Sequence, residues 1–526
     1  MFTGTLKPYQ VEAVERMAKQ KKMLVAYEMG LGKTCMTIAA LEELRERKEI
    51  TQPTLVIVLA SLKYQWEAEI TKFSNATVTV VDGSKAVRTR QYVDGTYTDY
   101  IVTNYESIVN DWELLKGLLF DAIVCDEATA IKGFRSKRSK KVKDLATKIP
   151  VKYALTGTPI ENGKPEELYS IMQFVEPTML GRFDLFDKTF IVRNHFGGVQ
   201  RYRNLPLLHE KIKEASVRKA QSDPDVAPYL PATIHLSPIK IRLNKPARIL
   251  YEKIKLDLTT DLEEAQSLFG GGFSLDAIYG QGQAFGGPID AMRGAIMSKI
   301  TALRMVCDSP SLLVDSATKY KLNQGLGGSS YASYLDDEGY LENLDLGASK
   351  LDAVVSYVVD HLDTDELSKV VIFTSYIGML SLLQNALLEK KIKSRIYSGQ
   401  LNAKEKEDSK LDFQNSKEVR VLISSDAGGY GVDLPQANLL VNYDLPWSAG
   451  KAVQRNSRIR RASSKWPSVI IQDFIVLNSI EERQFEMLNQ KNLVADAVVD
   501  GTGINTKGGV DLTVGSLLNF LLNATI

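Results

Sequence analysis

Seven residues near the N-terminus, Glu28–Thr34, combine glycines with a lysine and a threonine in an order that suits phosphate binding. They follow the short apolar run Met23–Ala26 and precede apolar residues at helical spacing, so the sequence predicts a strand, a turn and a helix. Gly30 and Gly32 would let the backbone wrap closely around a phosphate chain. The helix N-terminus would present free N–H groups and its positive dipole end to the same anion.

The last two residues of this segment would supply its chemistry. Lys33 would reach the β- and γ-phosphates of a nucleoside triphosphate, and Thr34 would ligate Mg²⁺. The strict phosphate-loop pattern has a further glycine at position 27, where this chain has Tyr27. On these residues alone the alternative is a helix cap with a surface lysine, but the flanking strand and helix favour phosphate binding.

A pair of acids suits a metal site beside such a loop. Asp126 and Glu127 follow the apolar run Ala122–Cys125, which places them at the carboxyl end of a predicted strand. Asp126 would hold Mg²⁺, directly or through water, and Glu127 would orient the attacking water. The alternative is an ordinary solvated strand end. Further on, Leu155–Pro159 ends another strand in a turn with two hydroxyls, which suits either a sensor of the nucleotide or a simple turn.

Two basic segments could bind phosphate. The segment Gln454–Arg461 contains four arginines, and an arginine finger accelerates phosphoryl transfer by roughly 10³–10⁵-fold. Its alternative is a basic helix face on nucleic acid or solvent. The segment Lys132–Lys143 holds seven basic residues, namely Lys132, Arg135, Lys137, Arg138, Lys140, Lys141 and Lys143. It suits a surface for DNA, a solvated helix face or a nuclear-import patch.

Composition limits the class of protein. The chain has 526 residues, which is too long for one core and predicts two to four domains. A net charge of +1 excludes a global basic field, so contacts with nucleic acid would need local patches. The three cysteines, Cys35, Cys125 and Cys307, lie far apart and suit a reducing compartment. Apolar runs such as Leu55–Ala60 are too short to span a bilayer, and we expect an intracellular protein without a membrane partner.

Apolar runs alternate with helical patterns in both halves of the chain, which predicts parallel sheets covered on both faces. The predicted strands are Met23–Ala26, Leu55–Leu59, Tyr100–Val102, Ala122–Cys125 and Tyr153–Leu155, then Val370–Phe373, Ser394–Tyr397, Val419–Ile423, Leu439–Val441 and Val469–Val476. Between the two sets lies a mostly helical stretch with glycine-rich segments, Gly270–Gly287 and Gly325–Ser330. We expect a first lobe at 1–180, helical insertions at 181–348, a second lobe at 349–495 and a tail at 496–526.

Taken in order, the motifs resemble those of helicase superfamily two, and specifically its SWI/SNF-type DNA translocases, over residues 5 to about 480. Leu6–Gln10 is similar to the adenine-reading motif of that family. Glu28–Thr34 resembles its motif I, which commonly lacks the first glycine. Asp126–Thr129 resembles the DEAH-like motif II, with threonine where histidine is usual. Leu155–Asn162 followed by Glu166–Ser170 is the most family-specific stretch.

The second half continues the resemblance. Ile372–Tyr376 looks like motif IV, and Ser424–Leu434 looks like motif V, with Asp433 where asparagine is common. Motif VI is looser, because Arg460 and Arg461 replace a glycine and a glutamine. This leaves open which arginine is the dominant finger. We place Arg458 first, Arg455 second and Arg461 third.

The resemblance implies an α/β protein with two RecA-like parallel-sheet lobes, helical insertions between them, and ATP and Mg²⁺ bound between the lobes. It implies catalytic roles for Lys33, Glu127, Gln454, Arg455 and Arg458. It implies nucleotide contacts from Gln10, Gly30, Gly32, Lys33, Thr34 and Asp433, with Thr34 and Asp126 as metal ligands. It implies DNA contacts from Ser61, Trp66, Thr103, Lys132, Arg135, Lys137, Arg138, Thr374, Ser375 and Ser424.

Three functions compete on this basis. The first is a DNA-stimulated ATPase that translocates on double-stranded DNA without sequence preference and remodels DNA or protein–DNA complexes. The second is a strand-separating or annealing helicase on forked DNA, although no segment can be assigned as a wedge. The third is an ATP-driven remodeller of a protein partner. We expect a cytoplasmic location, at the nucleoid or in a host cell if the source is viral, and a nuclear one in a eukaryote.

Overall fold

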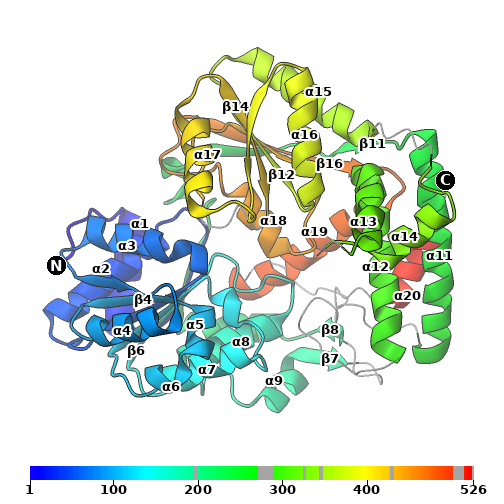
Figure 1. Cartoon of the computed structure of the whole chain (residues 1–526). Coiled ribbons are helices and arrows are strands. Elements are labelled where there is room, and N and C mark those ends of the chain that lie inside the picture. Colours follow the sequence, from blue (N-terminus) through cyan, green and yellow to red (C-terminus); the bar gives the residue numbers. More distant parts are fainter. Residues whose placement is uncertain are drawn as a thin grey trace. The chain divides into compact units, whose positions relative to one another are not determined.

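The computed structural model describes residues 1–193, 199–270, 288–323, 327–342, 348–426, 432–501 and 514–523. The chain divides into two compact units, each with its own α/β core (Figure 1). Unit 1 comprises Met1–Val192, Tyr202–Leu230 and Lys491–Lys507. Unit 2 comprises Arg193–Arg201, Pro231–Gln490 and Gly508–Ile526.

Unit 1 is built on a seven-stranded sheet in the order β3-β4-β2-β5-β6-β1-β9, with every pair parallel. The strands are β1 (Lys22–Tyr27), β2 (Thr54–Val58), β3 (Val78–Val80), β4 (Tyr100–Asn104), β5 (Ala122–Asp126), β6 (Val151–Leu155) and β9 (Ser216–Lys219). The central strands are continuous apolar runs because helices cover both faces of the sheet. The five strands predicted for this lobe are confirmed, whereas β3 and β9 were missed.

Helices pack on both faces of this sheet. They are α1 (Pro8–Gln20), α2 (Lys33–Glu46), α3 (Lys63–Phe73), α4 (Lys85–Gly95), α5 (Tyr105–Asn110), α6 (Trp112–Leu115), α7 (Lys137–Ala146), α8 (Pro165–Val175), α9 (Phe183–Phe190) and α10 (Leu205–Lys213). Short 3₁₀ turns are η1 (Ala60–Leu62), η2 (Ala128–Ile131) and η3 (Ala227–Tyr229), and β7 (Ile191–Arg193) pairs with β8 (Val199–Tyr202). Met17 of α1 and Met36 of α2 pack against Val25 in one buried cluster.

Unit 2 has a second parallel sheet in the order β10-β16-β15-β12-β14-β13, with β11 also paired to β16. The strands are β10 (Ala232–His235), β11 (Ile239–Ile241), β12 (Val370–Thr374), β13 (Lys393–Tyr397), β14 (Val419–Ser425), β15 (Leu439–Asn442) and β16 (Ser468–Val476). Ile372 lies opposite Ile423 on one side and Val441 on the other. The five strands predicted for this half are confirmed, and the α/β class with two parallel sheets is correct.

The helices of unit 2 form two groups. Around the sheet lie α15 (Ser349–Thr364), α16 (Ile377–Glu389), α17 (Ala403–Asn415), α18 (Ala449–Asn456) and α19 (Ile480–Val499), whose last residues count with unit 1. The other group consists of α11 (Lys245–Phe269), α12 (Pro288–Asp308), α13 (Ser311–Lys321), α14 (Ser330–Asp337) and α20 (Val514–Asn523). This group has its own core, a buried cluster that contains Leu518 of α20, Leu258 of α11 and Leu303 of α12.

The division into units differs from the four segments expected from sequence. The expected insertion at 181–348 is shared, because β9 pairs with β1 in unit 1 while α11–α14 pack in unit 2. The expected tail at 496–526 is also shared, since 496–501 belongs to unit 1 and α20 to unit 2. Most of the glycine-rich segments, namely 271–287 and 324–326, lies outside the described residues. Within the described ranges, every helix is too short or too polar to cross a membrane.

A buried ion cluster joins three helices of unit 2. The Lys350 ammonium at the start of α15 lies 2.9 Å from Asp308 Oδ1 of α12 and 2.6 Å from Glu481 Oε1 of α19. All three side chains are at most 2 % exposed. The Tyr443 hydroxyl donates to the Asp308 carbonyl at 2.6 Å, and the Val476 N–H donates to Glu481 Oε2 at 2.8 Å. Burial raises the pKa of Asp308 well above its usual value, although Lys350 opposes that shift.

Replacing Lys350 by methionine is expected to lower the free energy of unfolding by about 3–5 kcal/mol, because two carboxylates stay buried without their cation. Carboxyl groups whose pKa is raised in the folded state bind protons more readily there than in the unfolded chain. The loss should therefore shrink on acidification, for example from about pH 8 to about pH 5.5. Urea unfolding at both pH values measures this, with the exposed Lys319→Met as control. An equal midpoint for Lys350→Met and the control would contradict a structural role for the cluster.

Candidate nucleotide site

The predicted phosphate loop connects β1 to α2 in unit 1. Two of its residues have left-handed backbone conformations, Gly30 with φ 80° and Gly32 with φ 83°. A Cβ atom on Gly32 would lie 2.4 Å from Gln10 Nε2, so a larger residue has neither the conformation nor the space there. The loop therefore leads directly into α2 with Gly32 as the N-cap, and that residue has no side chain to cap that end of the helix. The N–H groups at a helix N-terminus of this kind suit an anion.

Gln10 and Tyr27 hold the loop from the inside. Gln10 donates from Nε2 to the Leu31 carbonyl at 2.9 Å, and its Oε1 accepts the Lys7 N–H at 2.8 Å. The predicted adenine-reading residue thus lies directly against the phosphate loop. Tyr27 is 2 % exposed and donates its hydroxyl to the Tyr9 carbonyl at 2.9 Å. The residue that departs from the strict glycine pattern is therefore a core side chain that anchors α1.

Lys33 lies at the first position of α2 and points back at the loop. Its ammonium donates to the Tyr27 carbonyl at 2.9 Å and to the Glu28 carbonyl at 3.3 Å. Thr34 follows it in the first turn of the same helix. Both residues lie where the sequence predicts them, on the helix N-terminus that follows a glycine turn.

The predicted acidic pair lies at the carboxyl end of β5. Asp126 Oδ2 accepts a hydrogen bond from Trp66 Nε1 at 2.7 Å, and its Oδ1 accepts the Glu127 N–H at 2.9 Å. Burial raises the pKa of Asp126, whereas the Trp66 hydrogen bond and the charge of Lys33 act in the opposite direction. The structure thus brings the acidic pair within electrostatic range of the phosphate-loop lysine. Glu127 has a left-handed backbone with φ 47°, a conformation that is uncommon outside glycine.

The donors at this place fit Mg²⁺. Magnesium prefers oxygen ligands and is usually held by one or two protein groups together with substrate phosphates. The Thr34 hydroxyl and the Asp126 carboxylate are such groups. Each oxygen of the Asp126 carboxylate accepts one hydrogen bond, which leaves each oxygen a further lone pair for a water molecule. Clusters of three or more histidine, cysteine, aspartate or glutamate side chains able to hold a metal do not occur among the described residues. This donor set suits a metal that arrives with its nucleotide.

The turn after β6 packs against the phosphate loop. A Cβ atom on Gly157 would overlap the Met29 side chain and would lie 3.2 Å from the Met29 backbone nitrogen, so a larger residue would have to displace the loop or its methionine. The Thr156 N–H donates to the Val25 carbonyl at 3.1 Å, and Thr156 Oγ1 accepts the Thr158 N–H at 3.1 Å. Because the turn touches the loop directly, the contact favours the hypothesis that this segment senses the nucleotide over an ordinary turn.

Several residues predicted to contact DNA have other roles in unit 1. Trp66 is 2 % exposed and bonds Asp126, and Thr103 is fully buried with Oγ1 2.6 Å from the Tyr92 hydroxyl. Both side chains are buried and hydrogen-bonded within unit 1, and their predicted contacts with DNA stay predictions. Lys132 forms ion pairs with Glu161 in the loop after β6 and with Glu167 in the first turn of α8. Its position favours holding that loop over contacting DNA.

Other residues of the basic segment differ in their exposure to solvent. Ser61, Arg135 and Lys137 are exposed, and Arg138 is partly exposed with an ion pair to Glu106 at 2.6 Å. Lys143, in contrast, is held by Ser170 and Gln173, and burial lowers its pKa to about 7. The exposed basic residues on and before α7 thus remain candidates for a phosphate-binding surface.

In unit 2 the predicted DNA contacts surround one buried carboxylate. Asp444 is fully buried and accepts from Thr374 Oγ1 at 2.6 Å, from Ser375 Oγ at 2.5 Å and from the Ser375 N–H. Thr374 and Ser424 are also fully buried, and their predicted contacts with DNA stay predictions. Ser375 is partly buried and is committed to Asp444. The motif IV hydroxyls therefore position Asp444, a residue for which the sequence had no role.

Arg455 connects several segments of unit 2 through hydrogen bonds. It is 3 % exposed, its Nε donates to Asp426 Oδ1 at 2.6 Å, and its Nη1 donates to the Asp444 carbonyl at 2.5 Å. Its Nη2 donates to Ser375 Oγ at 3.1 Å. Burial would lower the pKa of Arg455, but Asp426 and Asp444 raise it overall. With most of its donors committed, Arg455 joins motifs IV, V and VI, which weakens its case as a finger.

The other motif VI residues differ in their surroundings. Arg461 pairs with Asp433 at 2.6 Å, and the Asp433 side chain is about half exposed, as a nucleotide contact requires. Arg458 lies just beyond α18, and its charge acts on Tyr397. Gln454 is 6 % exposed on α18. Arg458 and Arg461 are each 6 % exposed, and the ranking of the arginines, with Arg458 first, stays a prediction.

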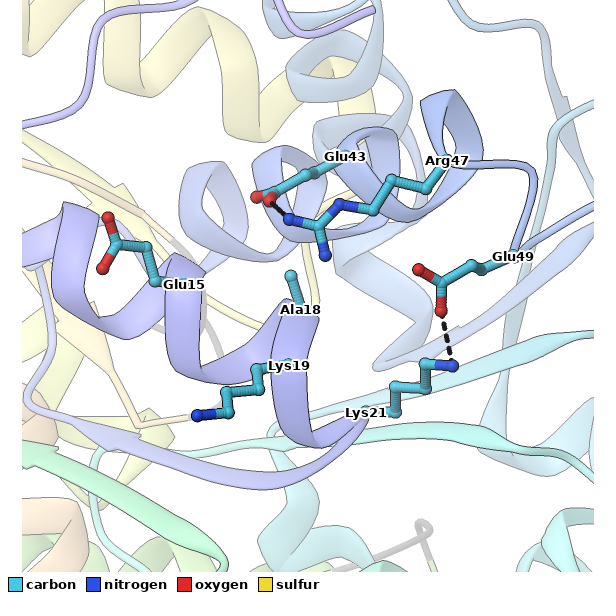
Figure 2. A pocket seen from close by; sticks show the side chains of 7 residues that line it. All are labelled: Glu15, Ala18, Lys19, Lys21, Glu43, Arg47 and Glu49. Atoms are coloured by element: carbon cyan, nitrogen blue, oxygen red, sulfur yellow. Dashed lines mark hydrogen bonds and ion pairs between the residues drawn. The ribbon is translucent and has the colours of Figure 1, made fainter.

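A separate pocket lies on unit 1 between α1 and α2 (Figure 2). Its lining consists of Glu15, Ala18, Lys19, Lys21, Glu43, Arg47 and Glu49. Glu43 pairs with Arg47, and Lys21 lies 2.5 Å from Glu49, so four of the charged side chains drawn in the figure form two ion pairs. The phosphate loop does not contribute to this pocket, and its charges balance. We assign it no chemistry.

The chain has two α/β units, each built on a parallel sheet, and one of them carries a phosphate loop beside an Asp–Glu pair. These features define a helicase-like P-loop ATPase. The chain belongs to the SNF2-related family: the SNF2-related domain matches residues 9–312, and the helicase conserved C-terminal domain matches residues 349–463. The resemblance to SWI/SNF-type proteins of helicase superfamily two is thereby confirmed.

Individual relatives agree with this assignment. An uncharacterized ATP-dependent helicase of Mycoplasma genitalium is 26 % identical over 504 residues, which cover 94 % of this chain and 42 % of that protein. The SWI/SNF-related matrix-associated actin-dependent regulator of chromatin subfamily A member 1 of Mus musculus is 27 % identical over 509 residues, covering 94 % and 43 %. This chain thus spans less than half the length of these relatives. The Pyrococcus furiosus Hef helicase domain shares the fold, with a TM-score of 0.52 at 16 % identity and coverage of 91 % and 97 %.

Proposed function

We propose that the protein is a DNA-stimulated ATPase that translocates on double-stranded DNA and remodels DNA or protein–DNA complexes. The observation that carries the proposal is the arrangement in unit 1, where Lys33 of the phosphate loop acts electrostatically on Asp126 of the acidic pair. The family match and the naming of one relative as a regulator of chromatin support the choice of DNA as the track.

The residues of unit 1 would divide the work of hydrolysis. The glycine turn and the start of α2 bind the triphosphate through backbone N–H groups, and Lys33 neutralises its outer phosphates. Mg²⁺, held by Thr34 and by Asp126 through water, would offset charge on the phosphates. Trp66 fixes the orientation of the Asp126 carboxylate. Glu127 accepts a proton from, and orients, the attacking water.

Unit 2 would supply the cation for the transition state. We assign this role to Arg458, with Asp433 as a nucleotide contact and Arg461 as its ion-pair partner. Arg455 would hold Asp444 and the motif IV hydroxyls in place. Hydrolysis would then alter contacts that both units make with the nucleotide, which is how nucleotide-held switches drive movement.

Double-stranded DNA is expected to stimulate ATP hydrolysis, and the stimulation should fall steeply with salt. Contacts to phosphates release counterions, so affinity drops by roughly 10³–10⁵-fold between about 50 and 200 mM salt for a protein that contacts six to ten phosphates. Phosphate release with duplexes of unrelated sequence at several salt concentrations measures this. The double variant Arg135→Ala/Lys137→Ala should weaken stimulation, with Lys19→Ala/Lys21→Ala as charge-matched control. Equal hydrolysis with and without any DNA would favour a protein partner instead.

Two assays separate translocation from strand separation. Displacement of the third strand of a triplex without unwinding of a fork indicates a motor that moves along intact duplex. Efficient unwinding of the fork indicates a helicase, and joining of complementary strands coated with a single-strand binding protein indicates annealing. We expect triplex displacement alone.

A further inference from the structure

An arginine to which the sequence analysis gave no role lies beside the phosphate loop. Arg218 is on the edge strand β9, opposite Ala26 of β1, immediately before the loop begins. Its Nη1 donates to the Ala26 carbonyl at 3.0 Å, and its Nη2 donates to Glu28 Oε1 at 2.9 Å. Glu28 is the first residue of the loop. Arg218 therefore contacts both the strand end and the carboxylate from which the loop starts.

The loop is held by the same segment on its other side. The Gln221 N–H donates to Glu28 Oε2 at 2.8 Å, and Gln221 Nε2 donates to the Met29 carbonyl at 2.6 Å. One oxygen of Glu28 is thus bonded by Arg218 of β9 and the other by Gln221, two residues beyond the strand. The orientation of the Glu28 carboxylate, and with it the start of the phosphate loop, depends on this segment.

The rest of the Arg218 guanidinium is bound by the end of α19. Arg218 Nε donates to Asp500 Oδ1 at 2.6 Å, and Nη2 lies 3.2 Å from Asp500 Oδ2, which is a bidentate ion pair. Asp496, one turn earlier, adds a further acid, and burial together with Asp500 raises its pKa. Arg218 is 19 % exposed, so its pairs are only partly screened by solvent.

The end of α19 is firmly placed on unit 1. His209 Nδ1 lies 3.0 Å from the Val498 carbonyl, where it caps the last turn. A Cβ atom on Gly501, which has φ 67°, would lie 2.9 Å from His209 Nε2. A Cβ atom on Gly163, in the loop after β6, would lie 3.1 Å from Lys491 Cα. These close approaches hold Asp500 at the position where it pairs with Arg218.

We propose that Arg218 is a positioning residue for the phosphate loop: it neutralises Glu28 and links the loop to the end of α19 through Asp500. A carboxylate at the start of the loop has the same sign of charge as the triphosphate that binds beside it. Pairing with Arg218 removes that repulsion and keeps the loop in shape. Asp500 and Glu28 share the positive charge of Arg218, so the pair with Asp500 weakens the neutralisation of Glu28. Through this competition the end of α19 adjusts the affinity of the protein for nucleotide.

The test is a charge-rescue experiment that reads the KM for ATP and kcat separately. Arg218→Ala should raise KM by roughly tenfold, the effect of one unpaired charge about 10 Å from the nucleotide at an effective dielectric constant near 20, while kcat changes less. Arg218→Ala/Glu28→Gln should return KM to within about threefold of Glu28→Gln alone, because the unpaired charge is gone. Arg218→Lys, which keeps the charge but loses the fork, should lie between wild type and Arg218→Ala. Asp500→Asn should leave KM unchanged or lower it.

Lys219→Ala is the matched control, since Lys219 is on the same strand but pairs with Asp225 at 2.7 Å. Thermal melting confirms that each variant is folded. An unchanged KM in Arg218→Ala, or a double variant as weak as Arg218→Ala, would overturn the proposal. The inference rests on ATP binding at this loop but not on DNA. Binding of a fluorescent ATP analogue reports it even if DNA stimulation fails.

Discussion

Glu127→Gln is expected to reduce ATP turnover by roughly 10²–10⁴-fold while nucleotide binding is retained. The amide keeps the size of the side chain and its hydrogen-bonding reach, but it is unable to take a proton from water. The substitution also leaves the backbone undisturbed, because glutamine and glutamate have a similar tolerance for the left-handed conformation at this position. Loss of turnover would therefore report on chemistry and not on the shape of the loop.

Steady-state phosphate release and equilibrium binding of a fluorescent ATP analogue together measure this effect. Glu113→Gln is the matched control, because Glu113 is an exposed acid of unit 1 that pairs only with the neighbouring Lys116. The control should hydrolyse ATP at the wild-type rate. Near-normal hydrolysis by Glu127→Gln would remove the assignment of Glu127 as the residue that activates water.

Arg458→Ala is expected to have an effect at least as large on kcat, roughly 10³–10⁵-fold, because an arginine finger acts on charge that develops only in the transition state. ATP affinity should change little, since the ground state uses the phosphate loop for most of its binding. Arg455→Ala should behave differently. It would leave Asp426 without its cation and Asp444 with Arg304 alone, at 3.9 Å, so loss of unit 2 stability should accompany any loss of activity.

Parallel measurement of kcat, ATP affinity and thermal stability separates these roles. Arg460→Ala serves as the control within the same motif, because Arg460 Nε donates to the Pro231 carbonyl on the edge of unit 2. Wild-type turnover in Arg458→Ala, together with lost turnover in Arg461→Ala, would transfer the finger role to Arg461. Lost turnover in both would indicate two fingers.

The main strands of both sheets could be predicted because they are buried on both faces and appear as uninterrupted apolar runs. β9, β10 and β11 could not. β9 is the polar segment Ser216–Lys219, and it is a strand because it pairs with β1 and not because of its own composition. β10 is mostly exposed, with alternation too weak to indicate a strand. Consequently the insertion expected at 181–348 was treated as one part, although the sheets divide it.

The site shows the same limit. Lys33, Asp126 and Glu127 occur in short local patterns that carry their chemistry, and the structure places them together. Trp66 bonds Asp126 across 60 residues of sequence, and nothing in its local pattern distinguishes that role from a DNA contact. Asp444 lies in a plain stretch after β15, and only its three-dimensional surroundings show that Thr374, Ser375 and Arg455 converge on it.

The composition of unit 1 from three separate stretches has a consequence for how the chain is made. Its last stretch, Lys491–Lys507, leaves the ribosome about 260 residues after Leu230. At 5–20 residues per second the delay is roughly 10–50 s. During that time Arg218 and His209 lack their partners at the end of α19, while the strands of the second sheet are being synthesised. A premature stop before Lys491 would thus damage the N-terminal unit, and nascent chains would expose it to chaperones and proteases longer than its position in the sequence suggests.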